Sequence, residues 1–200
     1  MIIPTVFLDA NILASRTLRN WLFTLSEVTS GSMFSLGTSD SALAEFEKTW
    51  QKRNPNLDGE IAKRLSGYIS DSCAQVITNA PAHNLEGLRD PKDQHIHSAV
   101  LHGAFDYLVT RDEDFLDLTE TVTDLLPYEI MSPDTILIQI NDSASHLVRE
   151  TVIQFMADRE KERALAPDRQ LKTMKQLLAE SGAPEFGLIV DKHCQTLATN

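Results

Sequence analysis

Apolar residues in the first 140 positions form short runs that alternate with longer stretches at helical spacing. The segment 105–110 shows the strongest pattern of a buried strand, and weaker runs stand at 6–8, 33–37, 74–77 and 128–130. Helical spacing fills the segments between them, at 11–28, 39–53, 57–69 and 90–103, and a short helix is expected from Glu113. This alternation predicts an α/β fold with a central, mainly parallel sheet flanked by helices. A further apolar run, 136–138, is expected to close this region.

The pattern changes after Asn141 to segments rich in Ala, Leu, Lys and Glu. They predict an all-helical extension of three helices, at 143–164, 168–181 and 184–197. Sixty residues are too few to bury a stable core alone, so we expect this extension to pack on the first region. A helical apolar stripe supports that expectation, formed by Leu147, Val148, Val152, Phe155 and Met156. The predicted division is therefore 1–140 and 141–200.

Composition narrows the class of protein. With 42% hydrophobic and 24% charged residues, the chain is typical of a folded globular protein. No apolar stretch approaches the roughly 18 residues of a membrane span, and the first residues lack a basic leader, so we expect a cytoplasmic protein without a membrane partner. Cys73 and Cys194 stand far apart and outside any CxxC pair, which excludes a cysteine zinc site.

Negative charge is concentrated in the first region. The net charge is -11, and residues 1–140 hold 10 Lys and Arg against 20 Asp and Glu, whereas residues 141–200 hold 8 against 9. Such acidity argues against a protein that wraps nucleic acid by neutralising its phosphates. It leaves open a nucleic-acid enzyme whose carboxylates bind divalent cations, because a bound metal reverses the local field.

Carboxylates stand out where predicted strands end or helices begin. Asp9 follows the first apolar run, at the carboxyl edge of an α/β sheet where ligands collect, although Asp is also a good helix N-cap. Asn11 is placed either to orient Asp9 or to cap the helix itself. Glu45 and Glu47 flank the packed face of the helix that begins near residue 39, so either could face a cleft or solvent.

Two further acidic segments can also be interpreted either as helix caps or as part of a binding site. Asp90 and Asp93 fit the capping of a helix that starts with Pro91, and they also fit a cation site at that helix start. Asp112 follows the strongest strand, and Asp114 stands beside it, but the loop lacks the glycine and spacing of an EF-hand. Asp93 and His97 share a helix face, although the chain has no HExxH pattern that would favour zinc.

In order, these segments resemble the PIN domain, a family of metal-dependent nucleases, from about Ile2 to Ile140. Residues 7–11 (FLDAN) resemble its hydrophobic-Asp-x-Asn opening, and residues 41–46 (SALAEF) its helical Glu motif. Residues 90–99 (DPKDQHIHSA) are similar to its DPxDxxxxxA segment, and residues 105–115 (FDYLVTRDEDF) to its closing strand and TxDxxF turn. The register of these motifs selects Glu45 over Glu47 and Asp93 over Asp90.

The resemblance implies a three-layer PIN-like fold and one acidic pocket for Mg²⁺ or Mn²⁺. The implied catalytic metal ligands are Asp9, Glu45, Asp93 and Asp112, with Asp114 as an adjoining ligand or outer partner and Asn11, Thr110 and Asp90 in support. Carboxylate and water oxygens suit these cations, so histidine is unnecessary. Basic residues that flank these segments could meet substrate phosphates: Arg16, Arg19, Lys48, Lys52, Arg53 and Arg111.

The resemblance further implies a ribonuclease, as in the toxin half of bacterial toxin–antitoxin pairs. A protein of that kind is expected to bind a small antitoxin and to form a homodimer. The alternative is a noncatalytic PIN-like RNA-binding or scaffold module, whose acidic residues serve only as helix caps. A Mg²⁺-dependent phosphatase or phosphotransferase is a third class, but a DxD pattern at Asp9 fails because position 11 is Asn, and the chain lacks a GxxxxGK[ST] phosphate loop.

Overall fold

The sheet is parallel throughout, as the alternating pattern predicts. The computed structural model describes residues 3–29, 31–166, 168 and 170–198, so Ile2 and residue 169 of the expected helix 168–181 lie outside it. Five strands pair in the order β3-β2-β1-β4-β5. Their bounds are Thr5–Leu8 (β1), Ser35–Ser39 (β2), Gln75–Ile77 (β3), Tyr107–Val109 (β4) and Glu129–Met131 (β5). The predicted α/β class is confirmed.

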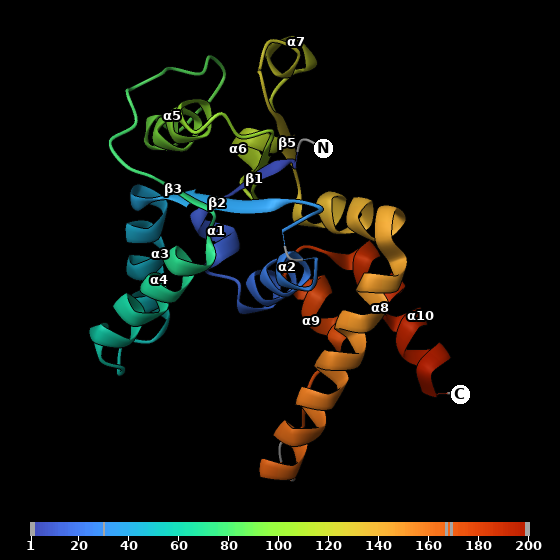
Figure 1. Cartoon of the computed structure of the whole chain (residues 1–200). Coiled ribbons are helices and arrows are strands. Elements are labelled where there is room, and N and C mark those ends of the chain that lie inside the picture. Colours follow the sequence, from blue (N-terminus) through green and yellow to red (C-terminus); the bar gives the residue numbers. More distant parts are fainter. Residues whose placement is uncertain (1–2, 30, 167, 169, 199–200) are drawn as a thin grey trace.

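Helices cover both faces of the sheet and give three layers (Figure 1). One layer holds the 3₁₀ helix η1 (Pro91–Asp93) with α5 (Gln94–His102), α6 (Glu113–Leu116) and α7 (Glu120–Thr123). The opposite layer begins with α1 (Ala10–Leu13), α2 (Arg16–Val28), α3 (Asp40–Arg53) and α4 (Gly59–Ser72). The C-terminal helices lie on this second side, as α8 (Pro133–Leu165), α9 (Met174–Glu180) and α10 (Pro184–Ala198).

The core is divided by the sheet into two apolar clusters. Phe7 packs in the cluster that holds Phe105 and Phe115, whereas its neighbour Leu8 packs in the cluster that holds Trp21. Side chains alternate between the faces of a strand, so adjacent residues enter different clusters. Because both faces are covered, the central strands β1 and β4 are mainly apolar, and this explains the clear strand pattern of the segment 105–110.

Two predicted elements are wrong in detail. The single helix expected over 11–28 is divided into α1 and α2, because the Ser15 side chain accepts the Leu18 amide and starts a new helix. The run 136–138 lies inside α8 and does not close the sheet region as expected. Ser132 caps α8 by accepting the Thr135 amide, and Pro133 occupies its first turn, so these start signals decide the element.

Helix α8 runs across the predicted boundary after residue 140, with a departure from helical geometry at Ala144. The division into 1–140 and 141–200 stays a prediction. Helix α9 begins only at Met174, where Thr173 and Gln176 form a capping box. None of the helices in the described segments is long and apolar enough to cross a membrane.

The C-terminal helices are joined to α2 by an aromatic cluster. Trp21 meets Phe155 of α8 and Phe186 of α10 edge-on, with ring centroids 4.8 and 5.1 Å apart. Asp134 adds a polar connection, because its carboxylate accepts the backbone amides of Glu185 (3.1 Å) and Phe186 (2.8 Å) at the start of α10. The first turn of α10 is thus capped from α8.

Candidate metal centre

The candidate site begins where β1 and β4 end side by side. Asp9 directly follows β1, and its amide donates to the Val109 carbonyl of β4 (3.2 Å). Thr110 and Asp112 follow β4, so the parallel register brings them to the same edge. Residues that are about 100 positions apart in the chain therefore become neighbours.

Asp9 is a buried carboxylate that takes no part in capping α1 within the described structure. Its Oδ2 accepts hydrogen bonds from the Thr110 hydroxyl (2.6 Å) and from the Asn11 amide. Burial raises the pKa of Asp9 to about 6, an effect that the Thr110 bond and the Ala10 amide oppose and that the charges of Glu45 and Asp112 reinforce. The capping interpretation of Asp9 therefore gives way to that of an oriented acidic group.

Asn11 and Thr110 hold the two strand ends in position. The Asn11 side chain donates to Thr110 Oγ1 (3.0 Å) and accepts the Arg111 amide (3.0 Å). Thr110 Oγ1 also accepts the amide of Asp112 (3.0 Å). These bonds link Asp9 to the Asp112 turn, which is the supporting arrangement expected of both residues.

Three carboxylates in the described part of the chain lie close enough together to share a metal ion. One oxygen from each of Asp93, Asp112 and Asp114 lies within 4.8 Å of the other two. Asp112 Oδ1 accepts the Asp114 amide (2.9 Å) and so caps α6, which leaves its second oxygen for a ligand. All donors are hard oxygens, which fits Mg²⁺ or Mn²⁺ better than zinc.

Asp93 and Asp90 have different roles although both stand at a helix start. Asp90 caps η1 by accepting the Lys92 amide (2.9 Å). Asp93 precedes α5, but its side chain makes no capping bond to the described residues. Partial burial and the charges of Asp112, Asp90 and Glu45 raise the pKa of Asp93 to about 6, whereas His95 lowers it.

The two glutamates of α3 differ in their effect on the site, because Glu45 and not Glu47 is among the charges that raise the pKa of Asp9 and of Asp93. The charge of Glu45 raises the pKa of both Asp9 and Asp93, and its Oε2 lies 3.9 Å from His95 Nε2. Glu47 instead acts on Lys63 of α4, whose pKa it helps to raise. The side chain of Glu45 is 53% exposed, so it lies at the open rim of the site.

Both carboxylate oxygens of Asp114 make contacts with other residues that its position in the sequence does not predict. Its Oδ1 lies 3.0 Å from Arg89 Nε, and its Oδ2 accepts the Asp90 amide (3.1 Å). These contacts attach the loop before η1 to the end of β4. They favour the outer-partner role for Asp114, and they identify Arg89 as a site residue for which the sequence pattern carries no signal.

His97 belongs to the core. It is buried, its Nδ1 lies 2.7 Å from the Tyr128 hydroxyl, and burial lowers its pKa. It is absent from the acidic group found in the described residues, so the Asp93 and His97 pair does not form a zinc site.

A family model described as "PIN domain" matches residues 5–114, which are more than half of the chain. The chain belongs to the PIN domain family. Members of this family are generally nucleases, and the match includes all the acidic site residues named above. Neither the curated proteins nor the solved structures contain a significant match to the chain.

The interpretation of Asp93 as a metal ligand predicts whether Asp93→Asn raises or lowers the melting temperature of the protein. The pKa of Asp93 is about 6 in the folded protein against 3.8 for an ordinary aspartate, so folding is weakened as pH rises from about 4 to 6. In EDTA, Asp93→Asn should therefore melt at the same or a higher temperature than the parent at pH 7.5. This gain should shrink at pH 4.5. Added Mg²⁺ should raise the melting temperature of the parent much more than that of the variant.

Asp58→Ala is the matched control for this measurement, because Asp58 caps α4 by accepting the Glu60 amide and is not among the causes of the Asp93 pKa shift. It removes a helix cap and should cost about 1 kcal/mol while the response to Mg²⁺ persists. If Asp93→Asn melts lower than the parent in EDTA and keeps the full response to Mg²⁺, Asp93 serves the helix and not the metal.

Proposed function

We propose that this chain is a Mg²⁺- or Mn²⁺-dependent ribonuclease that hydrolyses RNA phosphodiester bonds. The observation that carries the proposal is the meeting of Asp93, Asp112 and Asp114 within 4.8 Å, beside the buried Asp9. Asp9, Glu45, Asp93 and Asp112 would hold the cation, and Asp114 would support them. A cation held there would supply a bound water of lowered pKa as nucleophile and charge stabilisation for the leaving oxygen.

The residues around Asp9 organise this chemistry. Thr110 and Asn11 hold one Asp9 oxygen and thereby restrict the direction of the other. The mutual repulsion of the carboxylates is offset when a divalent cation binds, because each charge then gains an opposite partner. The same repulsion makes the empty arrangement a costly one, so a purely structural role explains it poorly.

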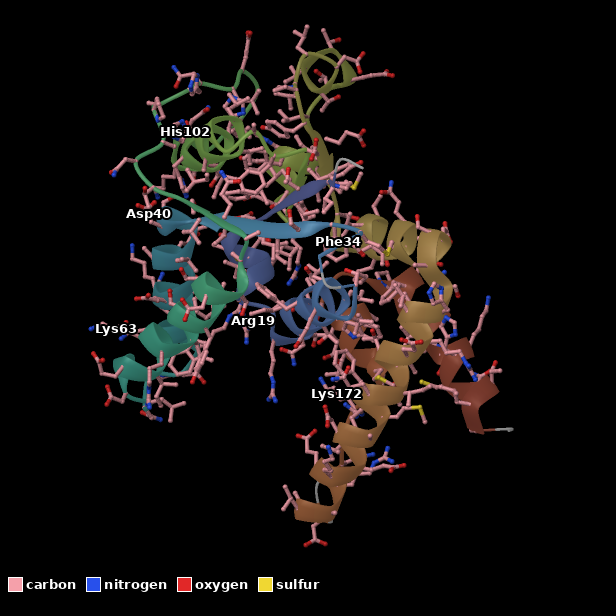
Figure 2. The ribbon with its side chains drawn as sticks, in the orientation of Figure 1. Arg19, Phe34, Asp40, Lys63, His102 and Lys172 are labelled. Carbon is pink, nitrogen blue, oxygen red and sulfur yellow. The ribbon has the colours of Figure 1, made fainter. Side chains whose placement is uncertain are left out.

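Basic residues near the turn between α1 and α2 support contact with a phosphate backbone. Arg53 donates to the Ala14 carbonyl (3.2 Å), and Arg19 donates to the Leu13 carbonyl and stacks over Phe46 at 5.7 Å. Figure 2 shows Arg19 on the α1 and α2 side of the sheet. Burial and the nearby charge of Arg16 lower the pKa of Arg19. Arg16 and Arg19 follow Asp9 closely in the chain, and Arg53 joins them at this turn from the end of α3.

The noncatalytic scaffold is the competing function. In that case the acidic residues would serve as helix caps, yet the side chains of Asp9 and Asp93 make no capping bonds in the described structure. We therefore favour catalysis. A toxin role, with an antitoxin partner, a homodimer and a cytoplasmic location, is the finer proposal drawn from the resemblance, and co-purification of a partner encoded by the adjacent gene would test it.

The two glutamates of α3 offer a matched test of the nuclease. With a labelled single-stranded RNA and Mg²⁺ or Mn²⁺, we expect Glu45→Gln to lower the cleavage rate by at least about 100-fold, because loss of a metal ligand should cost more than the roughly 10- to 100-fold that follows loss of a group that only orients one. Glu47→Gln should cleave like the parent, because Glu47 acts on Lys63 and not on the site. Cleavage by the parent that continues in excess EDTA would contradict the proposal.

A further inference from the structure

A cavity of about 350 Å³ lies next to the metal centre, where β2 and β3 end. Ser39 closes β2 and Ile77 closes β3, and both line the cavity. Since β2 pairs with β1, the cavity continues the sheet edge that carries Asp9. Figure 2 shows Asp40, another lining residue, at the passage from β2 into α3.

The outer wall of the cavity is held in place by side chains of α5. Gln94 accepts the Leu85 amide (2.7 Å) and donates to the Leu85 carbonyl (3.0 Å). The Ser98 hydroxyl accepts the His83 amide (2.9 Å) and donates to the His83 carbonyl (3.2 Å). These paired bonds attach the loop 78–90 to a helix, so the cavity is largely formed before a ligand arrives.

His95 connects the cavity to the metal centre. It lines the cavity, and its Nε2 lies 3.9 Å from Glu45 Oε2 at the rim of the acidic site. Ser41, on the cavity side of α3, stands one helical turn before Glu45. A polymer held at the metal centre would therefore present a neighbouring unit to this cavity.

The chemistry of the lining selects an uncharged planar group. No Lys or Arg is among the described residues that line the cavity, and the Asp40 carboxylate repels phosphate. Asn79 and Asn84 supply amide donors and acceptors, and the His83 and His95 rings offer surfaces for stacking. Hydrogen bonds to base edges and stacking on aromatic rings are how proteins bind bases of single-stranded RNA.

We propose that this cavity binds one nucleobase of the RNA, beside the phosphate cleaved at the metal centre, and prefers a base with an exocyclic amino group. This inference rests on the proposed ribonuclease. Asp40 Oδ1 accepts the Ser41 amide (2.7 Å), so the other carboxylate oxygen is the acceptor for such an amino group. Cytosine and adenine carry that donor where uracil presents its C4 carbonyl, and guanine carries an amino group at C2, whereas uracil has no exocyclic amino group.

Nucleoside binding tests this site without any cleavage. The ¹⁵N-labelled full chain in EDTA is titrated with cytidine or uridine while the side-chain amide resonances of Asn79 and Asn84 are followed by NMR. We expect saturable shifts, with cytidine binding at least about fivefold more tightly, the value of one hydrogen bond near 1 kcal/mol. In Asp40→Asn the oxygen still accepts from Ser41 and an amide replaces the acceptor, so the preference for cytidine should disappear.

Asp58→Asn is the control, because Asp58 caps α4 in a comparable way by accepting the Glu60 amide, and it should keep the preference. Equal affinities for the two nucleosides, no saturable shift at the two asparagines, or an unchanged preference in Asp40→Asn would each overturn the base site. If cytidine binds as expected but the parent does not cleave RNA, the proposed ribonuclease activity is wrong, while the cavity is still a nucleobase-binding site. If the parent cleaves RNA and shows no nucleoside preference, only the base site fails.

Discussion

Replacing Asp9 with Asn is expected to abolish RNA cleavage and to stabilise the metal-free protein at the same time. Loss of groups that merely orient a metal ligand lowers activity by about 10- to 100-fold, so loss of a ligand itself should cost at least about 100-fold. Burial raises the pKa of Asp9 to about 6, which means that the charged form weakens folding at neutral pH. Cleavage rates in Mg²⁺ and thermal melts in EDTA at pH 7.5 measure the two effects.

Asp106→Asn is the control for a lost aspartate elsewhere in the sheet region. Asp106 precedes β4, at the opposite end of that strand, and accepts the Thr5 amide (2.7 Å) and hydroxyl (2.8 Å). Its substitution should leave the cleavage rate unchanged and give no gain in stability. An Asp9→Asn protein that cleaves RNA at the parent rate would remove the basis of the metal-nuclease proposal.

Phe186→Ala is expected to produce the largest loss of stability. Phe186 is fully buried and packs edge-on against Trp21, so its removal leaves a cavity between α10 and α2. Large-to-small substitutions of buried phenylalanine cost about 3–5 kcal/mol. Urea unfolding followed by circular dichroism measures this loss, and a drop in the melting temperature of at least about 6 °C should accompany it.

Leu188→Ala on the same helix separates packing from helix formation. Leu188 is 41% exposed, and its substitution should change the free energy of unfolding by less than about 0.5 kcal/mol. Equal stability of Phe186→Ala and Leu188→Ala would show that the C-terminal helices do not stabilise the sheet region. In that case the aromatic cluster around Trp21 would contribute little to the free energy of unfolding.

Whereas β2, β3 and β5 contain polar residues and have weaker patterns, the central strands β1 and β4 were predictable because burial on both faces leaves short apolar runs. The run 136–138 has the same composition but lies in α8, since short apolar runs do not distinguish a buried strand from a helix. Ser132 and Pro133, immediately before it, carried the helix signal that decides the matter. Similarly, Ser15 marked the start of α2 in the sequence, although the apolar spacing ran on through it.

Local patterns of apolar and polar residues are enough to predict carboxylates at strand ends and helix starts. Those patterns allow both the cap and the ligand interpretation of Asp9, Asp90 and Asp93, since both need an acid at the same place in the chain, and only the register of the family motifs favours Asp93 over Asp90. The tertiary structure shows which of these side chains make capping bonds. Asp90 caps η1, while the neighbouring Asp93 turns to Asp112 and Asp114.

The contacts that decide the site join residues that are far apart in the chain. Thr110 orients Asp9 from the end of a neighbouring strand, and Arg89 holds Asp114 from a loop 25 positions earlier. Neither pair follows from spacing, because the order of the elements along the chain does not reveal that β4 pairs with β1 in the sheet. Local pattern thus supplied the chemical groups of this site, and long-range packing supplied their geometry.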